Sequence, residues 1–196
     1  MNADAFSDLA LALVCALVFE RRIRDMPGLA IPALLVGVAA CFGVLRFSGV
    51  TLALGPHKYT SLFAACAAFP LLAYALRFPD DPIARRLAAA NSFAFLLGGA
   101  GVAATVLCAD KWSDAAAALS ALVILWTMLF RKSALRLFGA LALIASFVVV
   151  LTVAPDARYF GFLTQVQGLH YLLCVAFATL TLTPARERQV VAPRSQ

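Results

Sequence analysis

The sequence contains few charged residues. Lys, Arg, Asp and Glu make up 13% of its 196 residues, whereas about 25% is usual in a soluble domain. The residues A, V, I, L, M, F, W, Y and C make up 63%, more than a soluble domain of this size can bury, because a small domain leaves much of its surface in water. The scarcity of charge therefore excludes a soluble enzyme and a disordered chain, and it predicts that lipid surrounds most of the protein.

The cysteine pattern excludes a disulfide framework and a zinc knot. The cysteines are odd in number, irregularly spaced and without a Cys-x-x-Cys motif, whereas both kinds of site need regular pairs. They lie within or at the ends of apolar runs, so we expect them to pack as small hydrophobic residues. These positions are Cys15, Cys41, Cys66, Cys108 and Cys174.

Missing side chains also exclude two cofactors and disfavour one kind of transport. The last apolar run has no lysine that could form a retinal Schiff base, and two histidines in the whole chain are too few for a multi-haem cytochrome. No Asp, Glu or Lys lies near the centre of any apolar run. Ion-coupled pumps and carriers of charged substrates usually need such residues, so both become poor interpretations.

Seven apolar runs remain, each close to the length that crosses a bilayer as a helix. They cover residues 6–20, 29–50, 58–77, 88–108, 113–130, 134–154 and 168–184. We predict an all-α polytopic membrane protein with a single seven-helix transmembrane domain over residues 1–185. A basic tail follows over residues 186–196, which we expect to be disordered in the cytoplasm.

The basic residues predict the orientation. Twelve of the sixteen Lys and Arg residues lie at or shortly after the ends of the first, third, fifth and seventh runs. Short loops rich in Lys and Arg stay in the cytoplasm, so the N-terminus is expected outside and the C-terminus inside a bacterial inner membrane. The exceptions are Arg46, Lys58, Lys111 and Arg158.

The two halves of the chain share a pattern that suggests an internal repeat. Each half opens with Ser-Asp before an apolar run, and each third run begins with a His near a Tyr. This favours a parallel repeat of three helices, one linker helix and three helices, an architecture known among transporters. The alternative is chance similarity between Ala- and Leu-rich helices. The shared residues are Ser7-Asp8 and Ser113-Asp114, and His57 with Tyr59 and His170 with Tyr171.

Ionisable residues gather at the outer ends of the predicted helices and form the candidate site. Two histidines with one or two carboxylates are a reasonable ligand set for a divalent metal, so His57 and His170 are the metal candidates. The alternative is that outer loops simply carry polar residues. For Arg46 the alternative is snorkelling to the lipid headgroups. The candidate residues for a small ligand or metal are Asp8, Arg46, His57, Asp114 and His170; no catalytic residue is assigned.

The overall plan resembles bacterial seven-helix membrane proteins of uncharacterised function. It is more distantly similar to the superfamily of alkaline ceramidases and progestin/adiponectin-type receptors, which share the N-out, C-in topology. Motif support comes from His170-x-x-x-Cys174, where that superfamily has a His-x-x-x-His metal pair. The resemblance implies zinc-dependent amide hydrolysis. The sequence departs from it because the second His is a Cys, and because the second run offers Arg46 and Ser48 rather than Ser and His.

Three functions follow as hypotheses. The first is a small-ligand or metal site on the outer side, with its enzymatic use left open. The second is a transporter of a small uncharged solute, lined by polar residues in the middle of the bundle. The third is an accessory or scaffold subunit of a membrane complex. Lipid is the expected partner, with a homo-oligomer or larger complex as further options, and nucleic acid is not expected because the basic residues sit in short loops. The transporter residues would be Asn91, Ser92, Thr127 and Ser146.

The glycines of the fourth apolar run predict close helix packing. Small residues let two helix backbones approach each other in a membrane. A neighbouring helix is therefore expected against Gly98, Gly99 and Gly101.

Overall fold

The computed structural model describes residues 2–107, 111–152, 154, 158–159 and 163–182. Helices dominate it, and the predicted all-α class is confirmed. Its long helices are α1 (Ala3–Arg22), α2 (Pro27–Phe47), α3 (Leu54–Arg77), α5 (Leu87–Leu107), α6 (Trp112–Phe130), α7 (Ala134–Thr152) and α8 (Gln165–Thr181). The short elements are the 3-10 turn η1 (Thr51–Ala53), helix α4 (Pro82–Arg85) and the antiparallel strands β1 (Arg158–Tyr159) and β2 (Leu163–Thr164).

Local side-chain chemistry sets several helix ends. The Asn2 side chain accepts a hydrogen bond from the Ala5 N–H and starts α1, which therefore begins three residues before the predicted run. Pro27 occupies the first turn of α2, where its missing N–H costs nothing. Thr164 and Gln167 form a capping box at the start of α8. This cap fixes the first turn of α8, which carries one of the candidate histidines.

The long helices support an integral membrane protein. Each predicted apolar run overlaps one of them, and five of the helices are long and apolar enough to cross a bilayer. These five are α2, α3 with the preceding η1, α5, α6 and α7. The count of seven spans stays a prediction, and the tail at 186–196 lies outside the described residues.

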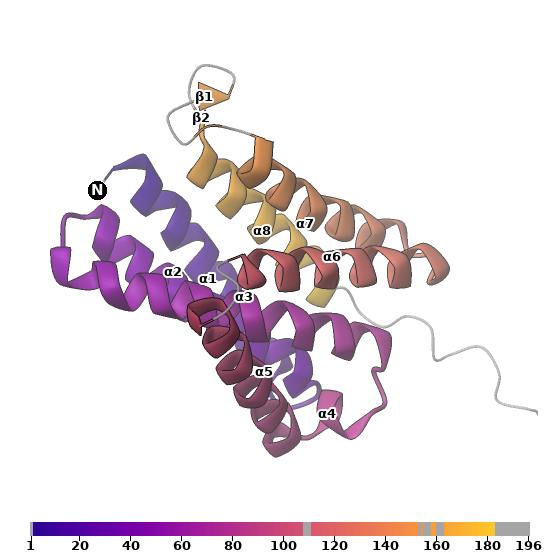
Figure 1. Cartoon of the computed structure of the whole chain (residues 1–196). Helices are drawn as coiled ribbons and strands as arrows, with labels where there is room; N and C mark the ends of the chain where they lie inside the picture. Colours follow the sequence, from indigo (N-terminus) through magenta and orange to yellow (C-terminus); the bar gives the residue numbers. More distant parts are fainter. Residues whose placement is uncertain (1, 108–110, 153, 155–157, 160–162, 183–196) are drawn as a thin grey trace, which may run out of the picture.

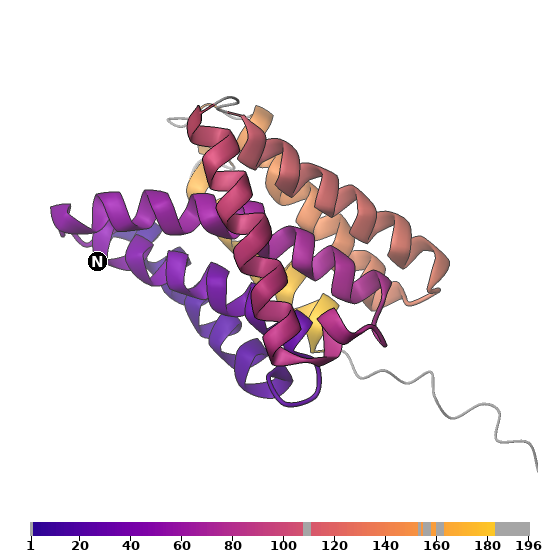
Figure 2. The ribbon, with the colours of Figure 1, turned by 60° about the horizontal axis from the view of Figure 1, so that its bottom comes forward.

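Six of the long helices form a closed ring. Helix α1 packs on α2, α2 on α3, α3 on α6, α6 on α7, α7 on α8, and α8 returns to α1. Helix α5 lies outside this ring and packs mainly on α3 (Figures 1 and 2). The first three helices and the last three therefore meet along two seams, α3 with α6 and α1 with α8.

The seam between α3 and α5 rests on small residues. Gly98 and Gly101 are buried, and a Cβ on either one would collide with Phe63 or Cys66 of α3. The predicted close approach is therefore found at these two glycines, whereas Gly99 is exposed. Within the described residues all four cysteines are free thiols.

The middle of the ring is filled by apolar side chains. Leu72, Leu143 and Phe177 are almost completely buried there, together with many alanines. Close packing of this kind gains dispersion energy from many short contacts. The core separates the two ends of the ring, and each end contains a cavity.

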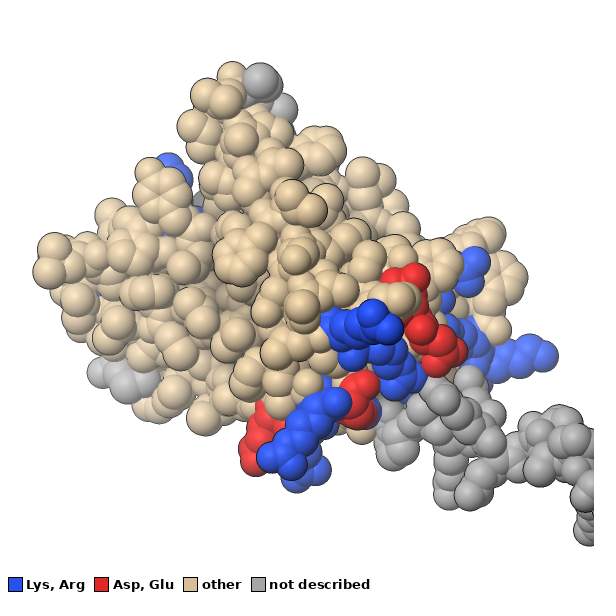
Figure 3. All heavy atoms as spheres, turned by 90° about the horizontal axis from the view of Figure 1, so that it is seen from below, with Lys and Arg blue, Asp and Glu red and all other residues tan. Residues whose placement is uncertain are grey.

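Most basic residues of the described chain gather at one end of the ring, with several carboxylates among them (Figure 3). The C-terminal turns of α1 and α3, helix α4 and the turn between α6 and α7 meet there. Arg131 Nη2 donates to the Arg77 carbonyl across this end, at 3.4 Å. We call it the basic end, and the opposite end, where α1 and α8 begin, the N-terminal end.

Candidate functional site

A partly open cavity of about 150 Å³ lies at the N-terminal end, among α1, α2, α3, α7 and α8. Its polar lining comes from α1, α3 and α8, and its deeper wall is apolar. Phe69 of α3 and Phe147 of α7 form part of that wall, with ring centroids 5.3 Å apart in an edge-on arrangement. The polar lining residues are Asp8, His57, Ser61 and His170.

Asp8 is a buried carboxylate that no hydrogen bond satisfies. Its exposed fraction is 1%, and among the described residues neither carboxylate oxygen has a hydrogen-bond partner. The nearest polar atom is Nδ1 of His170, 3.5 Å from Oδ1. The carboxylate fits here because it lies against Gly43 of α2, where a Cβ would be 2.5 Å from its Cγ and both oxygens.

The hydrogen bonds around His170 determine its tautomer. The Ser7 hydroxyl donates its proton to the Asp4 carbonyl at 2.7 Å. Its Oγ therefore acts as the acceptor toward His170 Nδ1, 3.0 Å away. His170 must then carry a proton on Nδ1, which leaves Nε2 of the neutral ring as an acceptor.

His57 is held in the same way from the other side of the cavity. Its Nδ1 lies 3.2 Å from the carbonyl oxygen of Ala39, which can only accept a proton. Phe47 also contacts the ring edge-on, at 6.3 Å between centroids. The neutral imidazole thus again has its proton on Nδ1 and a free electron pair on Nε2. Ser61, one helical turn further along α3, is 3.5 Å from Nδ1.

The polar part of the cavity therefore consists mainly of acceptors. It holds one carboxylate and two imidazoles whose Nε2 atoms have no hydrogen-bond partner among the described residues. Burying a carboxylate without a donor or a counter-charge is costly. Such an arrangement favours an occupant with hydrogen-bond donors or positive charge.

A second group of hydrogen bonds holds the cavity wall together. Oδ1 of Asp4 accepts from Thr164 Oγ1 at 2.9 Å and from Gln167 Nε2 at 2.7 Å. These bonds join the first turn of α1 to the first turn of α8. Because Asp8 and His170 lie one turn further along the same helices, the contacts of Asp4 fix their separation.

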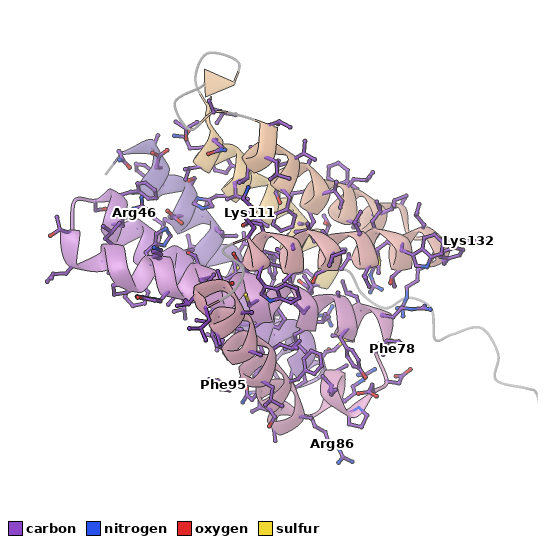
Figure 4. All side chains as sticks on the ribbon, viewed as in Figure 1. Arg46, Phe78, Arg86, Phe95, Lys111 and Lys132 are labelled. Atoms are coloured by element: carbon purple, nitrogen blue, oxygen red, sulfur yellow. The ribbon has the colours of Figure 1, made fainter. Side chains whose placement is uncertain are left out.

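Two of the candidate residues do not line this cavity, although the charge of Arg46 is near enough to act on Asp8 and His57. Arg46 is exposed near the end of α2, with its guanidinium 4.9 Å from the Phe47 ring centroid, and it forms no ion pair with a described carboxylate. Figure 4 shows it on the opposite side of the molecule from Arg86 and Lys132. Asp114 is exposed and lines a different pocket, together with Lys58. The structure therefore brings together Asp8, His57 and His170 only.

The described residues do not form a ready-made metal centre. No group of three or more His, Cys, Asp or Glu residues among them is close enough to hold a metal ion. Cys174, which follows His170 by one turn, packs against the core and does not line the cavity. The two histidines and Asp8 share a cavity, but an ion or ligand has to bridge them.

Sequence reasoning missed several residues that shape the site. Ser7 orients His170, Asp4 holds α1 against α8, and Gly43 makes room for Asp8. The signal for Ser61 was available, because it follows His57 by four residues and so shares its helix face. The role of Gly43 depends on how α1 packs on α2, which no local pattern reveals.

The chain matches no protein-family model, and no curated protein or solved structure is significantly similar to it. Its function therefore has to be inferred from the fold and the cavity.

Proposed function

We propose that this chain is a seven-helix protein of a bacterial inner membrane that binds a small cation in the cavity at its N-terminal end. The cation is either a divalent metal ion or an organic ammonium group. In this proposal the N-terminal end faces outward, as the distribution of basic residues predicts, and the basic end faces the cytoplasm.

One observation carries the proposal: the Asp8 carboxylate is 1% exposed and accepts no hydrogen bond from a described residue, yet it lines a cavity. A bound cation would offset its negative charge, and the low dielectric of the cavity would strengthen the attraction. The Nε2 atoms of His57 and His170 add two further electron pairs. Water could enter the mouth of the cavity, but it would not supply the missing charge.

The surroundings of the histidines agree with either cation. Histidines that bind a metal usually donate their other ring N–H to a carbonyl or a similar acceptor, as Ala39 and Ser7 provide here. The aromatic wall of Phe69 and Phe147 would in turn suit the apolar part of an organic amine. Metal chemistry is also what the resemblance to the ceramidase superfamily implies.

The alternatives have less support. A solute path through the middle would need polar side chains free to face it. Thr127 and Ser146 instead donate to carbonyls of their own helices, Val123 and Leu143, at 2.7 Å each, and Ser92 is exposed on α5. The ring order agrees with a parallel three-helix repeat, but both halves meet around a packed core. A scaffold role would not explain a buried, unpartnered carboxylate in a cavity.

Metal analysis and thermal unfolding of detergent-purified protein test the proposal. Zn²⁺ and a small primary amine are added in separate experiments. At least one of them should raise the unfolding temperature of the wild type in a saturable way. His57→Ala and His170→Ala should each weaken that effect about tenfold or more, since each removes one ligand atom. Arg86→Gln, which removes an exposed charge at the basic end (Figure 4), should leave it unchanged.

The outcomes separate the two cations. If the purified wild type contains stoichiometric metal and both histidine variants lack it, the bound cation is a metal ion. Stabilisation by the amine alone identifies an organic ligand. If neither cation stabilises the wild type, or if Arg86→Gln weakens binding as much as His170→Ala does, the cavity is not a cation site.

A further inference from the structure

The basic end contains a second cavity, of about 160 Å³, that the proposed function does not use. It is lined by arginines from α1, α4, the turn after α6 and the first turn of α7, which are far apart in sequence. Met26, Leu29, Ala75 and Leu76 form an apolar floor beneath them. The four arginines are Arg22, Arg85, Arg131 and Arg136.

Positive charge is in excess in this cavity. Its four guanidinium groups face one lining carboxylate, Asp80, and a second carboxylate, Asp25, lies next to it. Asp80 pairs with Arg85 at 3.1 Å and Asp25 pairs with Arg22 at 2.9 Å. Of the remaining arginines, Arg131 forms no ion pair with a described carboxylate. Like charges at short range repel each other, so an anion bound among them would relieve a real cost.

Backbone carbonyls hold two of the arginines in place. Arg22 Nε donates to the Thr181 carbonyl at 2.7 Å, and Arg85 Nε donates to the Pro79 carbonyl at the same distance. Arg85 Nη1 also donates to the Asp25 carbonyl at 3.2 Å. Arg85 Nη2 and Arg22 Nη1 donate to Asp80 and Asp25. Together these bonds fix the direction of both guanidinium groups, which lowers the entropy lost when an anion binds.

Arg131 is a positive charge in this cavity that no described carboxylate neutralises. Among the described residues, its side chain forms one hydrogen bond, a long one from Nη2 to the Arg77 carbonyl, and no carboxylate lies within salt-bridge distance of it. Its remaining N–H groups are free to donate. Guanidinium groups bind phosphate oxygens through paired N–H donors.

We infer that this cavity binds a phosphate group, with the head group of an anionic phospholipid as its first source and free phosphate as its second. The chemistry is shared, since both present phosphate oxygens to the arginines. The apolar floor would contact the glycerol and upper acyl carbons of a lipid. Basic pockets between membrane helices on the cytoplasmic side are suited to such head groups.

Thermal unfolding of the full-length protein in detergent tests this inference with three probes. They are dioctanoyl phosphatidylglycerol, dioctanoyl phosphatidylcholine and inorganic phosphate. The anionic lipid should raise the unfolding temperature in a saturable way, and the zwitterionic lipid should not. Stabilisation by phosphatidylglycerol alone identifies a lipid site, whereas stabilisation by inorganic phosphate alone identifies a soluble anion.

Variants locate the effect. Arg131→Gln should raise the apparent Kd for the stabilising probe about tenfold or more, because it removes a charge-assisted hydrogen-bond donor. Arg86→Gln and Lys132→Gln remove the same charge from exposed positions at the same end (Figure 4) and should change it less than about twofold.

Three results would overturn the inference. One is equal stabilisation by phosphatidylcholine and phosphatidylglycerol. Another is equal loss of binding in the control variants, which would indicate general surface attraction. The third is the absence of a saturable effect from either phosphate compound. If Arg131→Gln does not fold, Arg131→Lys and native mass spectrometry of the wild type decide, since a single site predicts one retained anionic lipid per chain.

Discussion

At the level of single residues, Asp8 is the most informative side chain of the protein. We expect Asp8→Asn to raise the stability of the ligand-free protein, because a neutral amide costs less to bury than a carboxylate without donors. A gain of about 1 kcal/mol would correspond to roughly 2–4 °C in a chain of this size. Stabilisation by cations should be lost in the same variant. Intrinsic fluorescence of Trp112 and Trp126 can follow unfolding.

Asp4→Asn is the matched comparison. The Asp4 carboxylate accepts two hydrogen bonds that join α1 to α8. The amide oxygen of Asn can still accept both, but without the charge that strengthens them, so stability should fall by about 1 kcal/mol. The two substitutions make the same chemical change four residues apart on one helix, and we expect opposite signs. A loss of stability in both would mean that the Asp8 carboxylate is stabilised within the ligand-free protein.

Gly43 permits the position of Asp8. In Gly43→Ala the new Cβ would lie 2.5 Å from the carboxylate, so either α1 moves away from α2 or Asp8 is pushed into the cavity. Overpacking of this kind costs about 1–3 kcal/mol. Gly55→Ala, which adds a methyl group with no atom within 4 Å, is the control. Urea or thermal unfolding gives the free energies.

A second substitution tests the cause of that loss. If the collision with Asp8 is responsible, Asp8→Ala should restore most of the stability lost in Gly43→Ala, and the double-mutant cycle should show coupling. Additive effects would place the strain elsewhere in the α1–α2 contact.

At the level of elements, helix α5 is attached to the ring rather than part of it. Gly101→Val should weaken the contact of α5 with α3, because even a Cβ would lie 2.5 Å from the Cβ of Cys66. The cavity at the N-terminal end has no lining residue from α5. We therefore expect a lower unfolding temperature and faster proteolysis around α4, with cation binding kept. Gly99→Val, on the exposed face of α5, should change neither property, and loss of cation binding in Gly101→Val would show that α5 supports the cavity.

Helices were the most predictable elements, and the reasons are physical. Long apolar runs must satisfy their own backbone hydrogen bonds in lipid, so the runs at 29–50 and 134–154 could be assigned to helices from composition alone. The capping box at Thr164 and the proline in the first turn of α2 are local signals that the predicted runs, which begin at 29 and 168, did not include. Which helices become neighbours was less accessible, because lipid-facing and protein-facing surfaces are both apolar.

The candidate site shows the same limit. The outer-end positions of Asp8, His57 and His170 follow from where each lies in its run, and the structure places them around one cavity. Arg46 and Asp114 have the same position along the helix axis but face other directions. The position of a residue along the helix axis can be predicted from the sequence. The direction in which its side chain points depends on which helices pack against it. That difference explains why three of the five candidates come together.

At the scale of the whole molecule, the two ends of the ring differ in charge chemistry. The N-terminal end concentrates acceptors around a buried carboxylate, and the basic end concentrates arginines around an apolar floor. A packed core of residues such as Leu72 and Phe177 separates them. The two cavities therefore act as independent sites in these proposals, and substitutions at one end should not change binding at the other.

The orientation of the whole molecule yields the last prediction. Single cysteines introduced into a variant without native cysteines report which end is accessible from each side of the membrane. Tyr59→Cys, exposed at the N-terminal end, should react with a membrane-impermeant maleimide in intact spheroplasts. Lys132→Cys, exposed at the basic end, should react only after permeabilisation, because its loop carries the positive charge that remains cytoplasmic. Arg86→Cys provides a second reporter at the basic end. Arg86 directly follows α4 and is separated from Lys132 by helices α5 and α6. Reaction of Lys132→Cys before permeabilisation would show that the bundle has the opposite orientation in the membrane. The proposed phosphate-binding cavity would then face away from the cytoplasm.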